Sequence, residues 1–259
     1  MRAFDLSGRV AVVSGAGSPT GIGLAVARQL GEMGARVALG GTTARVADRA
    51  RELRASGIES IAVIGDLTEP AAAEGLIQAA LQQWNRIDVV VNNAGMVSAA
   101  EPDFQSGGLA DTDLDTWHRS LGRNLDTAFL LTRAAMPQLI SGGWGRIVMV
   151  SSVTGPVMAM KEDVAYATAK AGMIGLCRAL AVDVAPVGVT VNAVAPGWVA
   201  TGSQTQEEHR QGLTTPMGRS GGAAEVAAAV AWFCSPGASY VTGQCLTVDG
   251  GNSVAEERR

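Results

Sequence analysis

Several residue types that build common functional sites are scarce in this sequence. It holds only two histidines, His118 and His209, so we expect no histidine-rich metal site and predict that both are surface residues. It holds three cysteines, an odd number without a CxxC pair, which favours reduced thiols and a cytoplasmic location. Basic residues form no run and the net charge is −4, which argues against binding to nucleic acid or to an anionic membrane surface.

Long apolar segments and tyrosines are also few. No stretch approaches the roughly 18 apolar residues that a membrane-spanning helix needs, so no membrane role is expected. The start of the chain, "MRAFDLSGRVAVVSG", leads through a polar turn into a short strand, so we do not expect a signal peptide. There are two tyrosines among 259 residues, and one of them, Tyr166, has Lys170 four positions later.

What the sequence does contain is a regular alternation of short Val/Ile-rich runs and longer amphipathic segments. The runs predict strands at 9–14, 36–41, 60–65, 87–93, 146–152, 188–194 and 245–250. The segments predict helices at 21–33, 43–56, 69–84, 111–139, 164–185 and 223–234. Continuous apolar runs are typical of strands that are covered on both faces. We therefore predict an α/β fold, a Rossmann-type doubly wound sheet of about seven mainly parallel strands flanked by helices, in one domain over residues 1–259.

The first predicted strand ends in a glycine-rich turn, "SGAGSPTGIGLAVA" (14–27), that leads into a helix. Glycines at such a turn let the backbone approach a pyrophosphate, and the helix N-terminus attracts its charge. The strict G-x-G-x-x-G pattern is not met, because its third glycine position falls on Thr20. A tight turn without a ligand uses the same residues, but its place after the first strand of an alternating chain favours a dinucleotide cradle.

From this point the chain resembles the short-chain dehydrogenase/reductase family, which carries TGxxxGIG at the glycine-rich turn. This chain has Ser14 in place of the threonine and about two extra residues. The family's further motifs follow in order as "NNAG" (92–95), Asn124 in "RNLDTAF", Ser152, Tyr166, Lys170, "NAVAPGWVAT" (192–201) and "TVDGG" (247–251). The resemblance covers nearly the whole chain and is nearest to β-ketoacyl carrier-protein reductases. It implies an oxidoreductase that uses NAD(P).

The predicted cofactor contacts come from four segments. "NNAG" ends a strand at the carboxyl edge of the sheet, where its small residues would admit the adenosine end, unless it is only a strand-ending turn. By resemblance Asp66 would receive the adenine amino group, with Leu67 supplying backbone; the alternative for Asp66 is a helix N-cap. By resemblance "PGWVAT" reaches the nicotinamide and pyrophosphate. The full set is Gly15, Ser18, Gly21, Ile22, Gly23, Thr42, Arg45, Asp66, Leu67, Asn93, Ala94, Gly95, Tyr166, Lys170, Pro196, Gly197, Val199 and Thr201.

The end of the second predicted strand distinguishes NADP from NAD. An acidic residue there would bind the ribose 2′-OH and repel a 2′-phosphate. This chain has "GGTT" (40–43) without an acid, followed by Arg45. Hydroxyl groups, amides at a helix start and one arginine suit a phosphate, so we predict NADP(H), with NAD as the alternative.

Tyr166 and Lys170, spaced i and i+4, share one face of their predicted helix. In an arbitrary protein such a pair is a packing contact. By resemblance, the catalytic residues are Asn124, Ser152, Tyr166 and Lys170. Tyr166 would exchange a proton with the substrate oxygen, Ser152 would hydrogen-bond that oxygen, and Asn124 would hold a relay water. A nearby ammonium and the oxidised nicotinamide are expected to lower the phenol pKa toward neutrality. The interval from Ser152 to Tyr166 is about one residue long for the family, so Ser151 is the alternative serine.

Substrate contacts are expected from the loops 96–108, 153–163 and 198–215. Met158 and Trp198 join Ser152 and Tyr166 as predicted substrate residues and indicate an apolar pocket, the alternative being core or lid packing. We favour a small-molecule ketone or β-keto substrate, with oxidation of a secondary alcohol as the alternative. By resemblance, the predicted helices 111–139 and 164–185 would pair between subunits in a homotetramer or homodimer.

Two other classes of protein are weighed against an oxidoreductase. The segment "GRSGG" (218–222) fits the G-x-S-x-G pattern of hydrolases, but no strand precedes it and no histidine follows it, which excludes that fold's triad. A non-catalytic cofactor-binding regulator could lose Ser152, Tyr166 or Lys170, yet the chain keeps all three.

Overall fold

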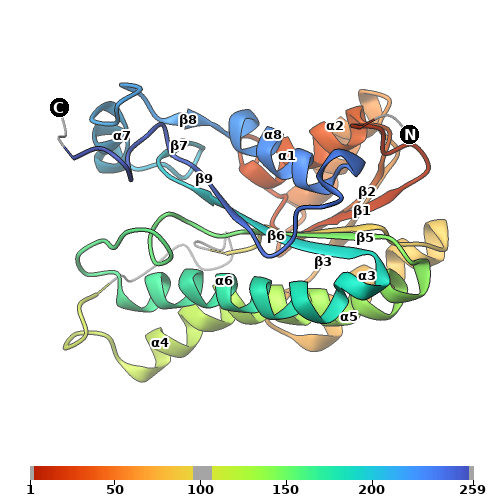
Figure 1. Ribbon diagram of the computed structural model, residues 1–259, viewed down its shortest axis with the longest axis horizontal. Helices are drawn as coiled ribbons and strands as arrows, with labels where there is room; N and C mark the ends of the chain where they lie inside the picture. Colours follow the sequence, from red (N-terminus) through yellow and green to blue (C-terminus); the bar gives the residue numbers. More distant parts are fainter. Residues whose placement is uncertain (1–2, 96–106, 257–259) are drawn as a thin grey trace.

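The computed structural model describes residues 3–95 and 107–256. Its centre is a parallel sheet of seven strands in the order β3-β2-β1-β4-β5-β6-β9 (Figure 1). The strands are β1 (Val10–Val13), β2 (Arg36–Gly41), β3 (Ser60–Ile64), β4 (Val89–Asn92), β5 (Gly145–Val150), β6 (Val189–Pro196) and β9 (Cys245–Val248). Each predicted strand is present within a few residues of its expected bounds, and the predicted fold class is confirmed.

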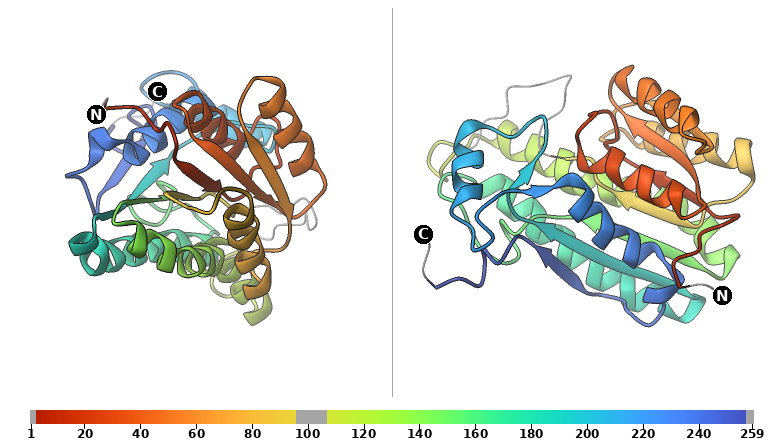
Figure 2. Two further views of the ribbon diagram at one scale, coloured as in Figure 1. Left: turned by 90° about the vertical axis from the view of Figure 1, so that its right-hand side faces the viewer. Right: turned by 90° about the horizontal axis from the view of Figure 1, so that it is seen from above.

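Helices cover both faces of the sheet (Figures 1 and 2). One face carries α1 (Ile22–Glu32), α2 (Arg45–Ala55) and α8 (Ala223–Cys234), and the other carries α3 (Pro70–Trp84), α4 (Leu114–Leu121), α5 (Thr127–Gly142) and α6 (Val164–Val184). Each layer buries its own apolar cluster, with Leu30 and Val230 in the first and Leu76 and Leu131 in the second. Burial on both faces explains why the strands are continuous apolar runs.

The order of the strands determines where a ligand can bind. Strand β1 lies between β2 and β4, so the chain winds outward in both directions from this point. In open α/β sheets the crevice at such a switch point, beyond the carboxyl ends of the strands, is the binding site. The same end of the molecule carries α7 (Gln206–Leu213) and a small ribbon in which β7 (Val199–Ala200) pairs with β8 (Gly221–Gly222) (Figure 1, left). These three short elements were not predicted.

The predicted helix 111–139 is wrong in one respect, because the structure divides it. A wide turn of π-helix over Gly122–Asp126 separates α4 from α5. The side-chain amide of Asn124 donates to the Ser120 carbonyl at 3.0 Å, and the Thr127 N–H donates to the carbonyl of Gly122, five residues back. Such wide turns occur frequently at functional sites, and this one contains Asn124.

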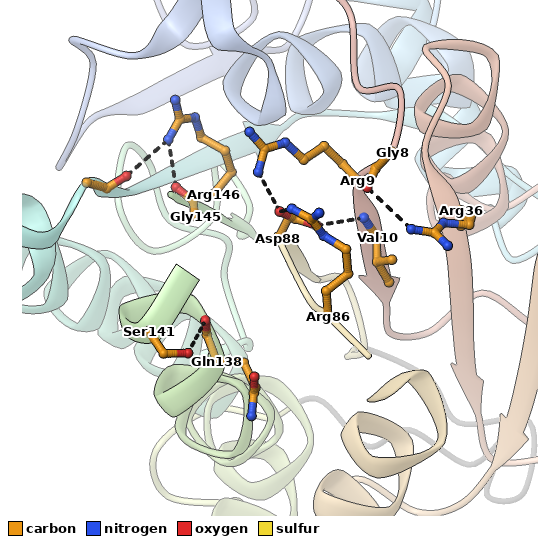
Figure 3. Close-up of polar contacts among 11 residues, drawn as sticks. Gly8, Arg9, Val10, Arg36, Arg86, Asp88, Gln138, Ser141, Gly145 and Arg146 are labelled. Carbon is orange, nitrogen blue, oxygen red and sulfur yellow. Dashed lines mark hydrogen bonds and ion pairs between the residues drawn. The ribbon is translucent and has the colours of Figure 1, made fainter. Parts of the chain in front are cut away.

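The opposite end of the sheet is held by a buried carboxylate (Figure 3). Asp88, just before β4, accepts hydrogen bonds from Arg9 at 2.7 Å, from Arg86 at 2.6 Å and from the Val10 N–H at 2.9 Å. Burial alone would raise the pKa of Asp88, but the hydrogen bonds from Arg86 and Arg9 hold that pKa below its ordinary value. This contact fixes the amino ends of β1 and β4 beside each other.

The scarce residue types lie where the sequence suggested. His118 and His209 are both exposed, as predicted. All three cysteines are free, with Cys177 and Cys234 buried. In the described ranges, no helix combines the length and the apolarity that crossing a membrane requires.

Candidate active site

The centre of the candidate site is the pair Tyr166 and Lys170 on one face of α6. The Lys170 Nζ lies over the Tyr166 ring, 5.6 Å from its centroid. Lys170 is only 4% exposed, and its Nζ donates to the carbonyl of Val150 at 3.1 Å, at the end of β5. The i, i+4 spacing therefore directs the ammonium toward the aromatic ring, within the range of a cation–π contact.

The two serines after β5 have different roles in the structure. The side chain of Ser152 is hydrogen-bonded to the Tyr166 phenol, and its Oγ also accepts from the Thr154 N–H at 3.1 Å. Ser151 is buried, and its Oγ donates to the carbonyl of Lys170 at 2.8 Å. The structure thus brings Ser152 to the phenol, while Ser151 attaches the end of the strand to α6.

Asn124 and Gly95 of the "NNAG" turn lie next to Lys170. Asn124 is fully buried in its wide turn. A Cβ placed on Gly95 would lie 2.6 Å from Asn124 Oδ1 and 3.2 Å from Lys170 Nζ, and Gly95 also has a φ of +153°. A residue without a side chain is needed here, because the turn passes directly against the asparagine and the lysine.

Burial dominates the electrostatics of this cluster. It raises the pKa of Tyr166 to about 12, against the lowering effect of the Ser152 hydrogen bond, and the charges of Asp163 and Glu208 raise that pKa further. Burial also lowers the pKa of Lys170 to about 8. In the protein alone, burial outweighs the Ser152 hydrogen bond, so its own groups do not bring the Tyr166 pKa toward neutrality as expected. The part of that expectation that rests on the oxidised nicotinamide stays a prediction. A phenol protonated at neutral pH is suited to donate a proton.

The glycine-rich turn between β1 and α1 is fastened to the "NNAG" turn. Ser14 Oγ accepts hydrogen bonds from the Asn93 N–H at 2.9 Å and the Ala94 N–H at 3.0 Å. The Asn93 side-chain amide donates to the Gly15 carbonyl at 3.1 Å. Ser14 thus joins the two turns, a role that the sequence indicated only through its place at the end of the first predicted strand.

The beginning of α1 fits a pyrophosphate. Its N-cap is Gly21, which has no side chain to cap the helix, and its first turn carries no acidic residue. The first N–H groups of a helix have no intrahelical acceptor, so an anion at this end would satisfy them. Gly15, Ser18, Ile22 and Gly23 all belong to this turn and helix start. The residues present therefore fit the phosphates of a dinucleotide.

The residues predicted to contact the adenosine lie after the ends of β2 and β3. A Cβ on Gly17 would lie 4.0 Å from the Cβ of Arg45, so the start of α2 adjoins the glycine-rich turn. Asp66 Oδ1 accepts from the N–H and the hydroxyl of Thr68, at 3.0 and 2.8 Å. The N-cap of α3 is Glu69, so the alternative of Asp66 as a helix cap is wrong. Leu67 is buried beside it.

The "PGWVAT" segment continues from β6 along the same edge of the sheet. The carbonyl of Pro196 accepts from the Val153 N–H at 3.0 Å, and the Gly197 N–H donates to the Val248 carbonyl. Val199 belongs to β7, and the Thr201 hydroxyl lies 3.0 Å from the Ser203 hydroxyl. These contacts hold the segment next to Ser152, while its cofactor contacts remain predictions.

The structure does not bring the predicted substrate residues Met158 and Trp198 together with Ser152 and Tyr166 as closely as it does the predicted catalytic residues. Met158 Sδ accepts from the Asn252 side-chain amide at 3.6 Å. Trp198 lines a cavity of about 70 Å³ together with Met217, Val226 and Val248, and its indole N–H is buried without a hydrogen-bond partner. Most of the first expected substrate loop, residues 96–106, lies outside the described residues. Substrate roles for Met158 and Trp198 therefore stay predictions.

Comparison with known proteins gives consistent matches. Residues 15–253 match the family model described as enoyl-(acyl carrier protein) reductase. The chain is 36% identical over 253 residues to the 3-oxoacyl-[acyl-carrier-protein] reductase of Pseudomonas aeruginosa, covering 96% of this chain and 98% of that protein. It is 37% identical over 247 residues to cis-4-hydroxycyclohexanecarboxylate dehydrogenase of Sinomonas cyclohexanicum, covering 94% of this chain and 96% of that protein.

A solved structure agrees over almost the full length. The crystal structure of a putative NAD(P)-dependent gluconate 5-dehydrogenase from Beutenbergia cavernae, with bound NADP at low occupancy, has a TM-score of 0.88 and 35% identity. The match covers 98% of this chain and all of that one. The similarity therefore extends over sheet, cradle and α6 together.

Proposed function

The chain belongs to the short-chain dehydrogenase/reductase family, an NAD(P)-dependent family of oxidoreductases, and from this premise we propose that it reduces a ketone or β-keto compound to a secondary alcohol with NADPH. The observation that carries the proposal is the cluster of Ser152, Tyr166 and Lys170 beside Asn124. It stands at the carboxyl edge of the sheet, next to a helix start suited to a pyrophosphate.

The proposed mechanism assigns one task to each side chain. When bound, the reduced nicotinamide would supply the hydride. Tyr166 donates its phenolic proton to the carbonyl oxygen, which becomes the alcohol oxygen. Ser152 hydrogen-bonds the phenol and the same oxygen. Lys170 stabilises the phenolate that remains, and Asn124 holds a water through which the proton is replaced.

NADP(H) is proposed on the residues around the end of β2. Thr42 and Thr43 follow the strand, and Arg45 begins α2, whose N-cap residue Ala44 offers no side-chain hydrogen bond. Arg45 is exposed and its Nε donates to the Thr43 hydroxyl at 3.4 Å. A guanidinium beside hydroxyls and helix-start amides suits a 2′-phosphate. The NADP named with the gluconate 5-dehydrogenase structure supports this choice, and NAD is the alternative.

Oxidation of a secondary alcohol is the second candidate. Two of the similar proteins are named dehydrogenases, which favours it. Oxidation needs the Tyr166 phenolate as a base, however, and in the protein without its cofactor burial raises the pKa of this phenol to about 12. Reduction needs the protonated form, which is the one present at neutral pH. We therefore place reduction first.

The test is a panel of linear β-keto esters, cyclic ketones and keto acids, each supplied with NADPH or NADH while the absorbance of the reduced nicotinamide is followed. The proposal expects consumption with at least one ketone and a preference for NADPH at low cofactor concentration. A strong preference for NADH would overturn the cofactor assignment. Turnover only of alcohols with the oxidised cofactor would establish the second candidate. Binding of the dinucleotide without turnover of any substrate would indicate a regulator.

We also propose a homotetramer or homodimer in the cytoplasm. Apolar side chains stand exposed on the long helices, with Phe129 and Ile140 on α5 and Val182 on α6. Pairing these helices between subunits would cover them. Three free cysteines suit a reducing compartment.

A further inference from the structure

The glycine-rich turn, which includes Ser18-Pro19-Thr20, makes a contact far along the chain. Residues 201–220, between β7 and β8 and including α7, are here called the lid. Thr20 Oγ1 accepts a hydrogen bond from the Gly202 N–H, at 2.8 Å and 182 residues away in sequence. The cofactor cradle and the first residues of the lid are thus directly joined.

The local geometry shows why Thr20 reaches the lid. The Gly21 N–H donates to the carbonyl of Ser18, which closes a tight turn around Pro19 and Thr20. On the lid side, a Cβ added to Gly202 would lie 2.9 Å from Thr20 Oγ1 and 4.0 Å from Ser18 Oγ. A larger residue at 202 would therefore force the Thr20 hydroxyl to move.

The lid is held at its other end by a different part of the chain. The Met217 N–H donates to the Gly250 carbonyl at 3.3 Å, just beyond β9. Within the lid, Gln204 donates to the Ser220 hydroxyl at 2.8 Å, and Thr205 begins α7 with a capping box. The Met217 end is tied to the sheet on the C-terminal side, whereas the Gly202 end is tied to the cradle.

We propose that Thr20 is a positioning residue that fastens the lid across the dinucleotide cleft. It holds Gly202, and with it the adjacent Thr201, against the glycine-rich turn. A dinucleotide enters and leaves when the Thr20–Gly202 hydrogen bond opens, so this bond slows cofactor release. The inference rests on the proposed function, because it takes the turn to be the cradle of a dinucleotide.

The first test measures the hydrogen bond without any cofactor. Hydrogen–deuterium exchange of the Gly202 amide is compared in the parent, Thr20→Val and Thr20→Ser. Valine keeps the shape of threonine but removes the acceptor, whereas serine keeps the hydroxyl. Losing one neutral hydrogen bond corresponds to about 2- to 10-fold faster exchange in Thr20→Val, with Thr20→Ser close to the parent. Equal exchange in all three proteins overturns the inference.

The second test measures release. Enzyme preloaded with NADPH is mixed with excess NADP⁺, and the loss of NADPH fluorescence gives the dissociation rate. We expect a rate about 2- to 10-fold higher in Thr20→Val than in the parent and Thr20→Ser, with the melting temperature unchanged. Parent-like release from Thr20→Val overturns the positioning role while leaving the proposed function standing. A parent that binds no dinucleotide overturns the proposed function, and with it the role of Thr20 in release.

Discussion

At the scale of single residues, burial shifts the pKa values of Tyr166 and Lys170, the proposed proton-transfer pair, in opposite directions. It raises the pKa of the Tyr166 phenol to about 12 and lowers that of the Lys170 ammonium to about 8. Both shifts favour the uncharged form of the group. The hydrogen bond from Ser152 is the contact within the protein that works against this for the phenol. Tyr166, the proposed proton donor, is therefore neutral and forms no ion pair with Lys170.

Replacing Tyr166 by phenylalanine removes the proton donor and keeps the ring that packs under Lys170. We expect kcat with NADPH and an active ketone to fall by about 10²- to 10⁴-fold, the usual contribution of a general acid. The dissociation constant for NADPH, from a fluorescence titration, should change little. A variant that keeps most of its activity would show that another group donates the proton.

Replacing Lys170 by methionine removes a buried charge together with the hydrogen bond to Val150. At pH 7 the variant should be more stable to urea by on the order of 2 kcal/mol, since the relief of desolvation exceeds one lost hydrogen bond. The folded parent releases this proton near pH 8 and the unfolded chain near 10.5, so the parent gains stability between those values. The stability advantage of the variant over the parent should therefore shrink between about pH 8 and 10.5, as measured by urea titrations at several pH values. A variant less stable than the parent at pH 7 contradicts this account, and activity should be lost in either case.

At the scale of elements, the amino ends of β1 and β4 depend on one carboxylate. Asp88 has a side chain only 4% exposed and takes hydrogen bonds from two arginines and a backbone amide. Nearby, the guanidinium groups of Arg9 and Arg146 both lie over the Trp144 ring, 4.0 and 4.2 Å from its centroid. Removing the single acid would leave this basic cluster without its counter-charge.

Asp88→Ala should therefore lower the free energy of unfolding by about 3 kcal/mol, because it removes hydrogen bonds to two arginines and leaves the buried Val10 N–H without its acceptor. Arg86→Ala is the matched control, since its side chain is 45% exposed and its loss should cost under about 1 kcal/mol. Both values come from urea unfolding followed by circular dichroism. Equal losses for the two variants would mean that Asp88 acts only as a surface partner.

The sequence predicted the elements far better than their interruptions. The seven sheet strands could be located because short apolar runs such as Val10–Val13 are typical of strands covered on both faces. The π turn at Asn124 could not be located from the sequence, because the hydrogen bond from its side chain to the Ser120 carbonyl leaves the apolar periodicity unchanged. The polar helix α7 carries little apolar pattern. Ser14 and Thr20 act through partners about 80 and 182 residues away, which spacing does not reveal.

The pair on α6 was predictable for the opposite reason. Its geometry is local, since Tyr166 and Lys170 lie one helical turn apart. The pKa of the Tyr166 phenol was not predictable, because its desolvation depends on all the residues packed around it. The residues of the substrate pocket could not be predicted either. Trp198, which was expected there, lines a small cavity with Val226 and Val248.

At the scale of the whole molecule, apolar side chains on α5 and α6 predict association. Light scattering coupled to gel filtration should give a mass of two or four chains. Phe129 is 47% exposed on α5, and Phe129→Asp should reduce that mass, because it places a charge at the proposed contact. Phe4 is 59% exposed, and its neighbour Ala3 accepts a hydrogen bond from the Gly237 N–H just after α8, so Phe4→Asp is the matched control. A parent that elutes as a single chain would refute the proposed assembly.

The placement of β1 between β2 and β4 also has a consequence for synthesis on the ribosome. Val10–Val13 can pair with β2 early, but their second neighbour arrives only with Val89–Asn92, and β6 gains its outer neighbour only with Cys245–Val248. A nascent chain therefore exposes unsatisfied strand edges for most of its translation. Chaperone demand during expression should be highest before the last strand emerges, and chains that stop short of it should aggregate.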